Sequence, residues 1–280
     1  MASLDRFAAP PAELSPPRAG EIHVWSVPLD PPAELVARHR RLLSEDEIAR
    51  ADRFRFDRHR RRYTVGRGVL RTLLGRYLDT DPAAVAFRYG GNDKPYLADR
   101  TAIRPAGEPE SRRPGSPARG AEAGPAPAGG QALWFNLSNS AELAVVALGT
   151  SAEIGVDVEA LRPMPDALAI AERFFSAAER EALAAVPAAE RDRAFFRCWT
   201  RKEAYLKAVG TGITVRLDAF DVTLGPGEPA RMLALDGDPE GAAAWRLHHL
   251  EPASGYLGAL AAPPPPSGGA WRLAGWRWAG

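Results

Sequence analysis

The stretch Cys198–Lys207, CWTRKEAYLK, is the segment from which the rest of the chain is best interpreted. It contains good helix formers and no proline or glycine, and Gly210 follows as an expected C-cap, so a helix is predicted here. Trp199, Glu203 and Lys207 recur every four residues and therefore share one helix face. A glutamate four residues before a lysine is also a common surface pair, worth about 0.2–0.5 kcal/mol. The helix alone therefore leaves both a solvated face and a functional site open.

A second acidic stretch lies upstream, in Ile154–Glu159, IGVDVE. Its alternation predicts a strand with the three apolar residues on one side and Asp157 and Glu159 on the other, roughly 7 Å apart along the strand. Two carboxylates on one strand face repel each other unless a positive charge lies between them. The pattern is compatible with a solvent-exposed edge. It is equally compatible with oxygen ligands for a divalent cation, most simply Mg²⁺ shared with a phosphate substrate.

Basic residues gather in the first third of the chain. Arg50 lies in a helix that the capping box Ser44–Glu47 is predicted to start. The dense run Arg58–Arg62 leads into an amphipathic helical pattern that ends near Gly75. Such a run is compatible with a solvated face or an RNA-binding patch. Arginines on both sides of it suit a discrete ligand with several phosphates equally well.

A glycine-rich turn and a polar segment complete the candidates. The turn over residues 90–97 places Lys94 beside the stiff Pro95, which on its own is weak evidence for phosphate binding. The segment Asn136–Asn139 comes later, shortly before an apolar run over 143–148 that predicts a buried strand. Neither segment indicates a function by itself, and both become informative only together with the acidic strand and the helix.

Composition bounds the class of protein. A chain of 280 residues with 45% hydrophobic content is long enough for one large or two small domains, and its formal net charge of +1 implies no general attraction to nucleic acid or membrane. Its single cysteine, Cys198, cannot form an intramolecular disulfide and indicates a reducing compartment. Aromatic neighbours favour burial of this thiol over a role as nucleophile. No signal peptide or membrane span is apparent, so a cytoplasmic protein is expected.

The order and spacing of four segments resemble the 4′-phosphopantetheinyl transferases: Lys94-Pro95, Asn136–Asn139, Gly155–Glu159 and Trp199–Lys207. The signatures of that family are a G-[IV]-D motif with a further acid two residues on, and a W-x-x-K-E-A-x-x-K helix. Both are complete here. The likeness runs from about residue 22 to residue 260 and is closest to the large monomeric type that activates peptide synthetases and polyketide synthases.

The resemblance implies an α+β fold of two similar α/β halves related by a pseudo-twofold axis, with coenzyme A in the cleft between them. The N-terminal half is expected at 21–149, and the C-terminal half, carrying the metal site, at 150–262. Composition predicts a disordered tail at 1–20 and a disordered insertion at about 98–130. Residues 263–280 form a C-terminal tail whose tryptophans we expect to be packing groups.

The activity that the resemblance implies is transfer of the 4′-phosphopantetheine arm of coenzyme A to a serine of an acyl or peptidyl carrier protein, with release of 3′,5′-ADP. By the same resemblance, Asp157 and Glu159 bind Mg²⁺, and Glu203 completes the metal shell or takes the serine proton. Lys207, one turn farther along the helix, contacts the phosphate. A metal and a lysine are the usual means of stabilising charge that builds on phosphate oxygens.

The resemblance also assigns residues to the nucleotide. Two arginines hold the 3′-phosphate end, and four residues line the adenine and phosphate pocket: Arg50 and Arg62, then Lys94, Pro95, Ser138 and Asn139. There is one departure, because the family usually has histidine at the position of Asn139. Asparagine donates a hydrogen bond but carries no charge, so this departure is expected to affect the strength of nucleotide binding.

Three other classes of function are compatible with parts of this sequence pattern. A metal-dependent hydrolase that cleaves the diphosphate of coenzyme A would use the same acids, but only Glu203 stands at the helix site. A non-catalytic binding module, weakened at Asn139, is disfavoured because both acidic motifs and Lys207 are retained. A nucleic-acid binder using Arg58–Arg62 is disfavoured by the near-neutral charge and the lack of interleaved aromatic residues.

Overall fold

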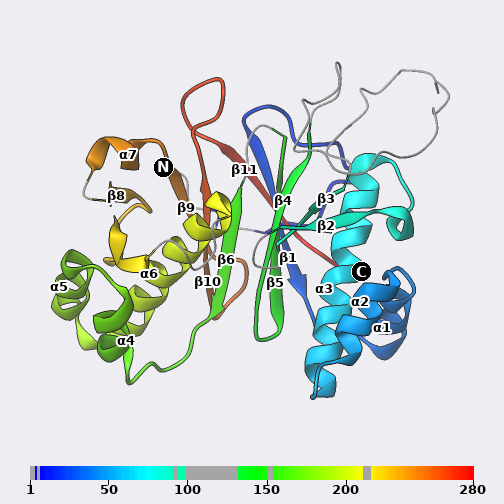
Figure 1. Cartoon of the computed structure of the whole chain (residues 1–280), viewed down its shortest axis with the longest axis horizontal. Coiled ribbons are helices and arrows are strands. Elements are labelled where there is room, and N and C mark those ends of the chain that lie inside the picture. Colours follow the sequence, from blue (N-terminus) through cyan, green and yellow to red (C-terminus); the bar gives the residue numbers. More distant parts are fainter. Residues whose placement is uncertain are drawn as a thin grey trace.

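The structure is a computed structural model of the chain, and it describes residues 4, 7–90, 94–98, 132–150, 154–210, 216–236 and 238–280. The insertion expected at about 98–130 lies outside the described residues, apart from residue 98. Helices and sheets are mixed throughout the described part (Figure 1), which confirms the α+β class. No helix in this part is long and apolar enough to cross a bilayer.

The two halves follow a similar order of elements, namely a strand, three helices, a short hairpin and two longer strands, and the second half adds the short helix α7 after its hairpin. The first half comprises β1 (Glu21–Pro28), α1 (Ala33–Arg40), α2 (Glu45–Asp52), α3 (Asp57–Leu78), β2 (Phe87–Tyr89), β3 (Pro95–Leu97), β4 (Trp134–Ser140) and β5 (Leu143–Gly149). The second half comprises β6 (Gly155–Ala160), α4 (Ala167–Phe174), α5 (Ala177–Ala185), α6 (Ala188–Val209), β7 (Phe220–Val222), β8 (Met232–Leu235), α7 (Pro239–Ala243), β9 (Arg246–Leu250) and β10 (Tyr256–Ala262). A last strand, β11 (Arg272–Arg277), follows them.

The two main sheets lie back to back between two long helices. One sheet has the order β11-β1-β5-β4 and the other β6-β10-β9. Helix α3 covers the outer face of the first sheet and α6 that of the second, which gives four layers (Figure 1). A third apolar cluster, with Val24 of β1, Val145 of β5 and Val156 of β6, fills the space between the sheets.

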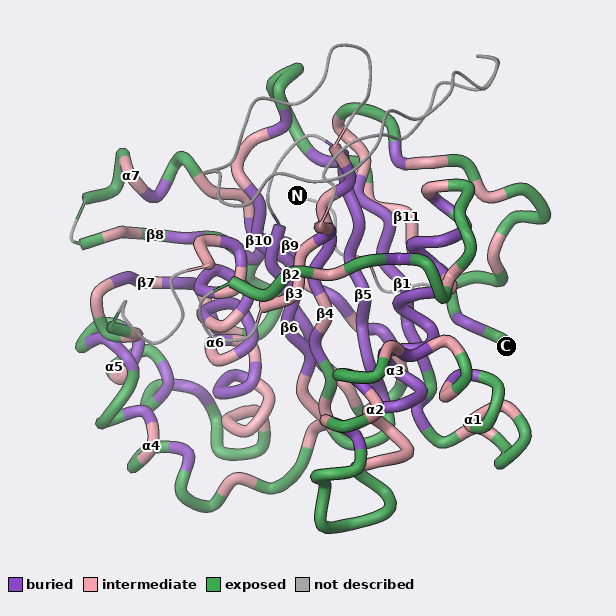
Figure 2. Tube along the Cα trace, turned by 45° about the vertical axis from the view of Figure 1, so that its right-hand side comes forward, coloured by how far each residue is buried: buried purple, intermediate pink, exposed green. Residues whose placement is uncertain are grey.

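This layering explains why β5, a central strand of the first sheet, is apolar on both faces. Residues of β5 alternate between the cluster under α3, which contains Val146, and the cluster between the sheets, which contains Val145. Strand β5 is therefore buried along its whole length, as Figure 2 shows. A continuous apolar run is typical of a strand covered on both sides, and the burial predicted for 143–148 is confirmed.

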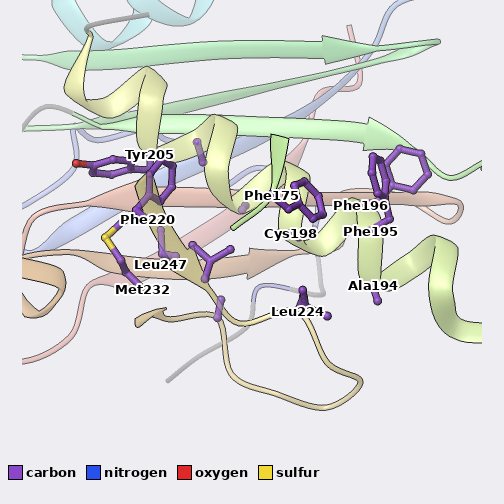
Figure 3. Close-up of a cluster of buried hydrophobic side chains, with 14 of the residues drawn as sticks. Phe175, Ala194, Phe195, Phe196, Cys198, Tyr205, Phe220, Leu224, Met232 and Leu247 are labelled. Atoms are coloured by element: carbon purple, nitrogen blue, oxygen red, sulfur yellow. The ribbon is translucent and has the colours of Figure 1, made fainter. Parts of the chain in front are cut away.

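The second half has an aromatic core beneath α6. Phe175, Phe195 and Phe196 pack at one end of this core, and Tyr205 contacts Phe220 at the other (Figure 3). Cys198 lies between them and is fully buried, so its predicted role as a small packing residue is confirmed. Burial also raises the pKa of this thiol well above its usual value, which makes it a poor nucleophile.

The described parts of both termini are paired with the sheets, in contrast to the tails expected from composition. The N–H of Leu4 donates to His249 O of β9, and the N–H of Ala8 donates to Gly275 O of β11. Strand β11 itself runs parallel to β1. The physical reason is that β9 and β11 are strands at the sheet edges, where unpaired backbone groups accept a partner. Trp271 and Trp278 are buried, so the packing role expected for the C-terminal tryptophans is confirmed.

The predicted capping box at Ser44–Glu47 is present, a second one starts α5, and each also anchors a long helix. Glu179, at N3 of α5, accepts from Ser176 N and pairs with the buried Lys202 of α6 at 2.8 Å. In the first half Glu47, at N3 of α2, accepts from Ser44 N. Its carboxylate also pairs with two buried arginines of α3, Arg67 and Arg71. These buried charges are acceptable because each one is paired and hydrogen-bonded.

Candidate active site

A close crossing of α6 over β6 brings the two signature motifs together. A Cβ atom placed on Gly155 would come within 2.0 Å of Ala204 O and 2.3 Å of Ala208 N. Only glycine permits this approach, and the short side chains of Ala204 and Ala208 accommodate it on the helix side. The predicted helix is confirmed within α6, and Gly210 caps it in the left-handed conformation with φ of 75°. The crossing sets Glu203 and Lys207 over the acidic face of β6.

Lys207, Asp157 and Ser138 form a closed triangle of contacts. Lys207 Nζ lies 2.6 Å from Asp157 Oδ1 and donates to Ser138 Oγ at 2.8 Å, while Ser138 Oγ donates to Asp157 Oδ1 at 2.8 Å. The ion pair of Lys207 is thus made across the layers, to Asp157, and not along its own helix. The second carboxylate oxygen, Asp157 Oδ2, is buried and has no hydrogen-bond partner. It is the one unsatisfied buried acceptor among the described side chains of this triangle.

The electrostatics of Asp157 reflect these contacts. Its side chain is only 7% exposed, and burial raises the pKa of the carboxyl group. The Lys207 ammonium and the Ser138 hydroxyl act in the opposite direction because they stabilise the carboxylate. Asp157 is thus a desolvated carboxyl group with one satisfied oxygen.

Glu159 and Glu203 lie close enough to this triangle to interact with its charges. Ser140 Oγ donates to Glu159 Oε2 at 2.8 Å, and Arg162 Nη1 approaches the same oxygen at 3.4 Å. The pKa of Glu203 is raised, first by burial and then by the charge of Asp157, while Lys207 lowers it. The predicted sidedness of β6 is confirmed, since Val156 and Val158 enter the core between the sheets.

The nucleotide residues expected from the resemblance fall into two groups. Lys94 Nζ donates to Lys207 O near the C-terminus of α6, so it stands next to the triangle. Arg62 is held by Asp30 at 2.6 Å and Glu142 at 2.9 Å. Arg50 lies over the Tyr63 ring, 5.9 Å from its centroid. The two arginines therefore belong to the α2–α3 side of the molecule, and the charge of Arg62 is already compensated.

Two cavities flank β4. One, of about 230 Å³, lies between the β2–β3 hairpin, β4 and the end of α6, and Lys94, Pro95, Phe135 and Gly210 line it. The other has a similar volume and lies on the α3 side, where Arg62, Tyr63 and Asn139 line it. Ser138 and Asn139 are neighbours on a strand, so they point to opposite faces, one toward Asp157 and the other toward the second cavity.

The carboxylates fit a hard cation without enclosing one. Asp157, Glu159 and Glu203 can each offer carboxylate oxygens as metal ligands, and their charges repel one another. In addition, Asp157 Oδ2 has no hydrogen-bond partner. Within the described residues, no group of three or more His, Cys, Asp or Glu side chains is gathered tightly enough to form a metal shell. This arrangement suits Mg²⁺, which usually binds through one or two carboxylates and takes its other ligands from water and substrate phosphates.

The sequence analysis includes Asn136 in a motif without giving it a role, and it does not single out Ser140. Asn136 Oδ1 accepts from Val156 N at 2.9 Å, and Ser140 Oγ accepts from Ala160 N at 3.1 Å. A signal was available, because polar residues at 136, 138 and 140 alternate with apolar or exposed residues on one predicted strand.

The chain is similar to known proteins over the segments that form this site. Residues 153–261, which include β6 and α6, match the model of the 4′-phosphopantetheinyl transferase superfamily. The chain is 40% identical to the 4′-phosphopantetheinyl transferase HetI of Nostoc sp. over 86% of its own length and 87% of that protein. It is 35% identical to a putative 4′-phosphopantetheinyl transferase of Synechocystis sp. over 68% of its own length and 65% of that protein. A third relative is the enzyme psf-1 of Bacillus pumilus, 30% identical over 65% of this chain and 64% of that protein.

The match to HetI spans both halves of the fold, and the family model spans the strand and the helix that carry Asp157, Glu203 and Lys207. The chain therefore belongs to the 4′-phosphopantetheinyl transferase superfamily, whose members transfer the phosphopantetheine arm of coenzyme A to carrier proteins.

Proposed function

We propose that the transfer is Mg²⁺-dependent and that Asp157, Glu159 and Glu203 hold the ion, with Lys207 beside it. The observation that carries this proposal is Asp157 Oδ2, a buried oxygen without a hydrogen-bond partner. An unsatisfied buried acceptor is costly, and a bound cation would satisfy it. When bound, Mg²⁺ would neutralise charge on the pyrophosphate of coenzyme A and help to orient it.

The residues of the chain have separate tasks in this proposal. The carrier serine attacks the phosphorus that bears the pantetheine arm, its Oγ–P bond forms, and the P–O bond to 3′,5′-ADP breaks. Glu203 takes the serine proton, because its carboxylate lies close enough to Asp157 and Lys207 to interact with both, at the place where the serine would meet the phosphate. Lys207, already oriented by Asp157 and Ser138, donates to the phosphate oxygens on which charge develops.

Both halves contribute to this one site. Ser138 and Lys94 come from the first half, and Asp157, Glu203 and Lys207 come from the second. Because one chain completes the site, we propose that the protein acts as a monomer.

The proposal is tested by incubating a panel of apo carrier domains with coenzyme A, with and without Mg²⁺, and measuring the mass of each domain. A mass gain equal to the phosphopantetheine arm, lost on chelation and restored by Mg²⁺, is the expected result. Incubation with coenzyme A alone distinguishes a hydrolase, which would release 3′,5′-ADP without any carrier. Transfer that proceeds unchanged in chelator would exclude the metal.

The nucleotide subsite is proposed to include Arg50, Arg62, Lys94, Pro95 and Asn139. Lys94 and Pro95 line the cavity beside α6, and Asn139 lines the cavity beside α3 together with Arg62. Asparagine at 139 supplies a donor to a phosphate oxygen but no charge.

We therefore expect Asn139→His to tighten coenzyme A binding about 2- to 5-fold near pH 6, where the imidazole is charged. Near pH 8 the imidazole is neutral and the dissociation constant should equal that of the unmodified enzyme. Calorimetric titration of coenzyme A across this range, without carrier, measures the effect. Asn139→Gln is the control, since it retains an uncharged donor and should show no such pH dependence. Weaker binding by the histidine variant at every pH would remove Asn139 from the subsite.

The carrier protein is proposed to dock beside Glu159. Leu168 and Phe174 of α4 are 44% and 38% exposed, and an apolar hollow of about 160 Å³ lies next to them, lined by Ile170, Trp199 and others. Glu159 lines the same hollow. An exposed apolar patch at the edge of a catalytic site is typical of a protein-binding surface.

On this basis Leu168→Asp should raise the KM for the carrier roughly tenfold, the effect of a loss of about 1.4 kcal/mol, and leave the KM for coenzyme A unchanged. Leu233→Asp is the matched control, because Leu233 is 51% exposed but lies on β8. Steady-state kinetics with each substrate varied in turn measures both constants. An equal rise for both substrates would indicate a folding defect and contradict the docking proposal.

A further inference from the structure

The contact between β4 and β6 joins the two halves of the molecule through side chains. The two strands lie against each other, but the backbone ladders of the described strands end at β4 in one sheet and at β6 in the other. Three polar residues of β4 at alternate positions, Asn136, Ser138 and Ser140, reach across to β6. We call these three residues and their contacts the polar seam.

The polar seam takes the place of a backbone ladder. Asn136 Oδ1 and Ser140 Oγ accept the N–H groups of Val156 and Ala160, four residues apart. Both N–H groups lie on the edge of β6 that faces β4, so without these side chains they would have no partner from a neighbouring strand. Because the two contacts bracket the acidic pair, they determine where Asp157 and Glu159 stand relative to the first half.

Ser140 differs from Asn136 because it also contacts an acid directly. A hydroxyl group has one proton. Ser140 Oγ accepts from Ala160 N, and its proton is then directed to Glu159 Oε2, 2.8 Å away. Ser138 does the same for Asp157, since it accepts from Lys207 Nζ and donates to Asp157 Oδ1. Each carboxylate of β6 is therefore held by one serine of β4.

A second group contacts the same oxygen of Glu159. Arg162 Nη1 is 3.4 Å from Glu159 Oε2, and the Arg162 side chain is 53% exposed. A surface ion pair of this kind is weak, but among the described residues Arg162 is the partner that this oxygen keeps if the Ser140 hydroxyl is removed. Glu159 would then be oriented by an exposed arginine and no longer by a fixed strand.

We propose that Ser140 is a positioning residue that holds the Glu159 carboxylate against β4 and thereby sets the affinity of the site for Mg²⁺. This inference rests on the proposed function, because it assumes that Glu159 is a ligand of the ion. Partners that orient metal ligands typically change metal affinity 10- to 100-fold when they are removed. Ser140 neither moves a proton nor contacts the reacting phosphate in the proposed reaction, so its effect on kcat should disappear once Mg²⁺ saturates the site.

The test is a Mg²⁺ titration of the full chain by calorimetry, without coenzyme A or carrier. Ser140→Ala should raise the dissociation constant for Mg²⁺ about 10-fold, and Ser140→Thr, which keeps the hydroxyl, should restore it. In transfer assays, Ser140→Ala should raise the Mg²⁺ concentration for half-maximal rate by the same factor, with kcat at saturating Mg²⁺ within about 2-fold of the unmodified enzyme. If Ser140→Ala does not fold, Ser140→Cys has similar volume and donates far more weakly, so it carries the same expectation.

An unchanged Mg²⁺ affinity in a folded Ser140→Ala variant would overturn the inference. So would a fall in kcat at every Mg²⁺ concentration with the half-maximal point unmoved, which is the result of a purely structural role. Failure of the proposed function looks different, because the unmodified enzyme itself would then bind no Mg²⁺ and transfer equally well in chelator.

Discussion

Replacement of Asp157 by asparagine is expected to lower the rate of transfer about 10³-fold, the upper range for loss of one preorganised electrostatic group. The amide keeps the shape of the side chain and can still accept from Ser138. It has lost the charge that orients Lys207 at 2.6 Å and the free oxygen that is proposed to bind Mg²⁺. Formation of holo carrier, followed by mass spectrometry at saturating coenzyme A and Mg²⁺, measures the effect.

The fold should tolerate this change. Burial raises the pKa of the Asp157 carboxyl, so the charged form is desolvated and a neutral amide costs little. Lys207 is 30% exposed and can be solvated when its partner is removed. Asp218→Asn is the control, since Asp218 belongs to an exposed ion pair with Arg216 and should leave the rate unchanged. Near-normal turnover by Asp157→Asn at limiting Mg²⁺ would exclude this residue from the metal site.

Glu203→Gln is expected to lower kcat by at least about 10²-fold, the scale of the loss of a general base, while coenzyme A remains bound. Glutamine has the same shape but accepts no proton. The pH profile offers a second readout, because the base acts only when it is deprotonated. Burial and Asp157 raise the pKa of Glu203, whereas a bound Mg²⁺ would lower it, so kcat of the unmodified enzyme should rise with pH through a limb whose midpoint reports the balance of the two effects.

That limb should be absent from the profile of Glu203→Gln, which has no titratable group at this position. The matched control is Glu190→Gln, on the first turn of the same helix, where the side chain is 44% exposed and lies 3.9 Å from Arg197. It should alter neither kcat nor the pH profile. A Glu203→Gln variant with normal kcat would assign the proton transfer to another group.

Local patterns in the sequence were sufficient for the elements that carry the chemistry. The i, i+4, i+8 spacing of Trp199, Glu203 and Lys207 predicted one helix face, and the alternation around Asp157 predicted which side of β6 is acidic. Both are properties of a single element with a fixed period, so they do not depend on the rest of the fold. The same holds for the capping boxes and for the glycine cap at the end of α6.

Pairings between distant segments were decided only by the tertiary structure. The sequence places Glu203 one turn from Lys207, yet Lys207 pairs with Asp157, because the bare backbone of Gly155 lets α6 lie directly on β6. Arg62 has a strongly basic context in the sequence, but two acids from other loops neutralise it. Such outcomes depend on which long side chains the packing brings within a few ångströms, and no local period encodes that.

The polar seam and the chain termini also combine a local sequence pattern with partners that only the fold provides. Alternation alone places Asn136, Ser138 and Ser140 on one side of a strand, but only the packing of β4 against β6 brings that side against the acids that we propose to bind Mg²⁺. Residues near both chain ends have the composition of loose tails, and they are ordered where described because β9 and β11 offer unpaired edges. The sequence by itself thus determined the family, the helix and strand of the site and the faces they present. The fold decided the partners of each charge, because opposite charges and open strand edges pair according to proximity in space and not along the chain.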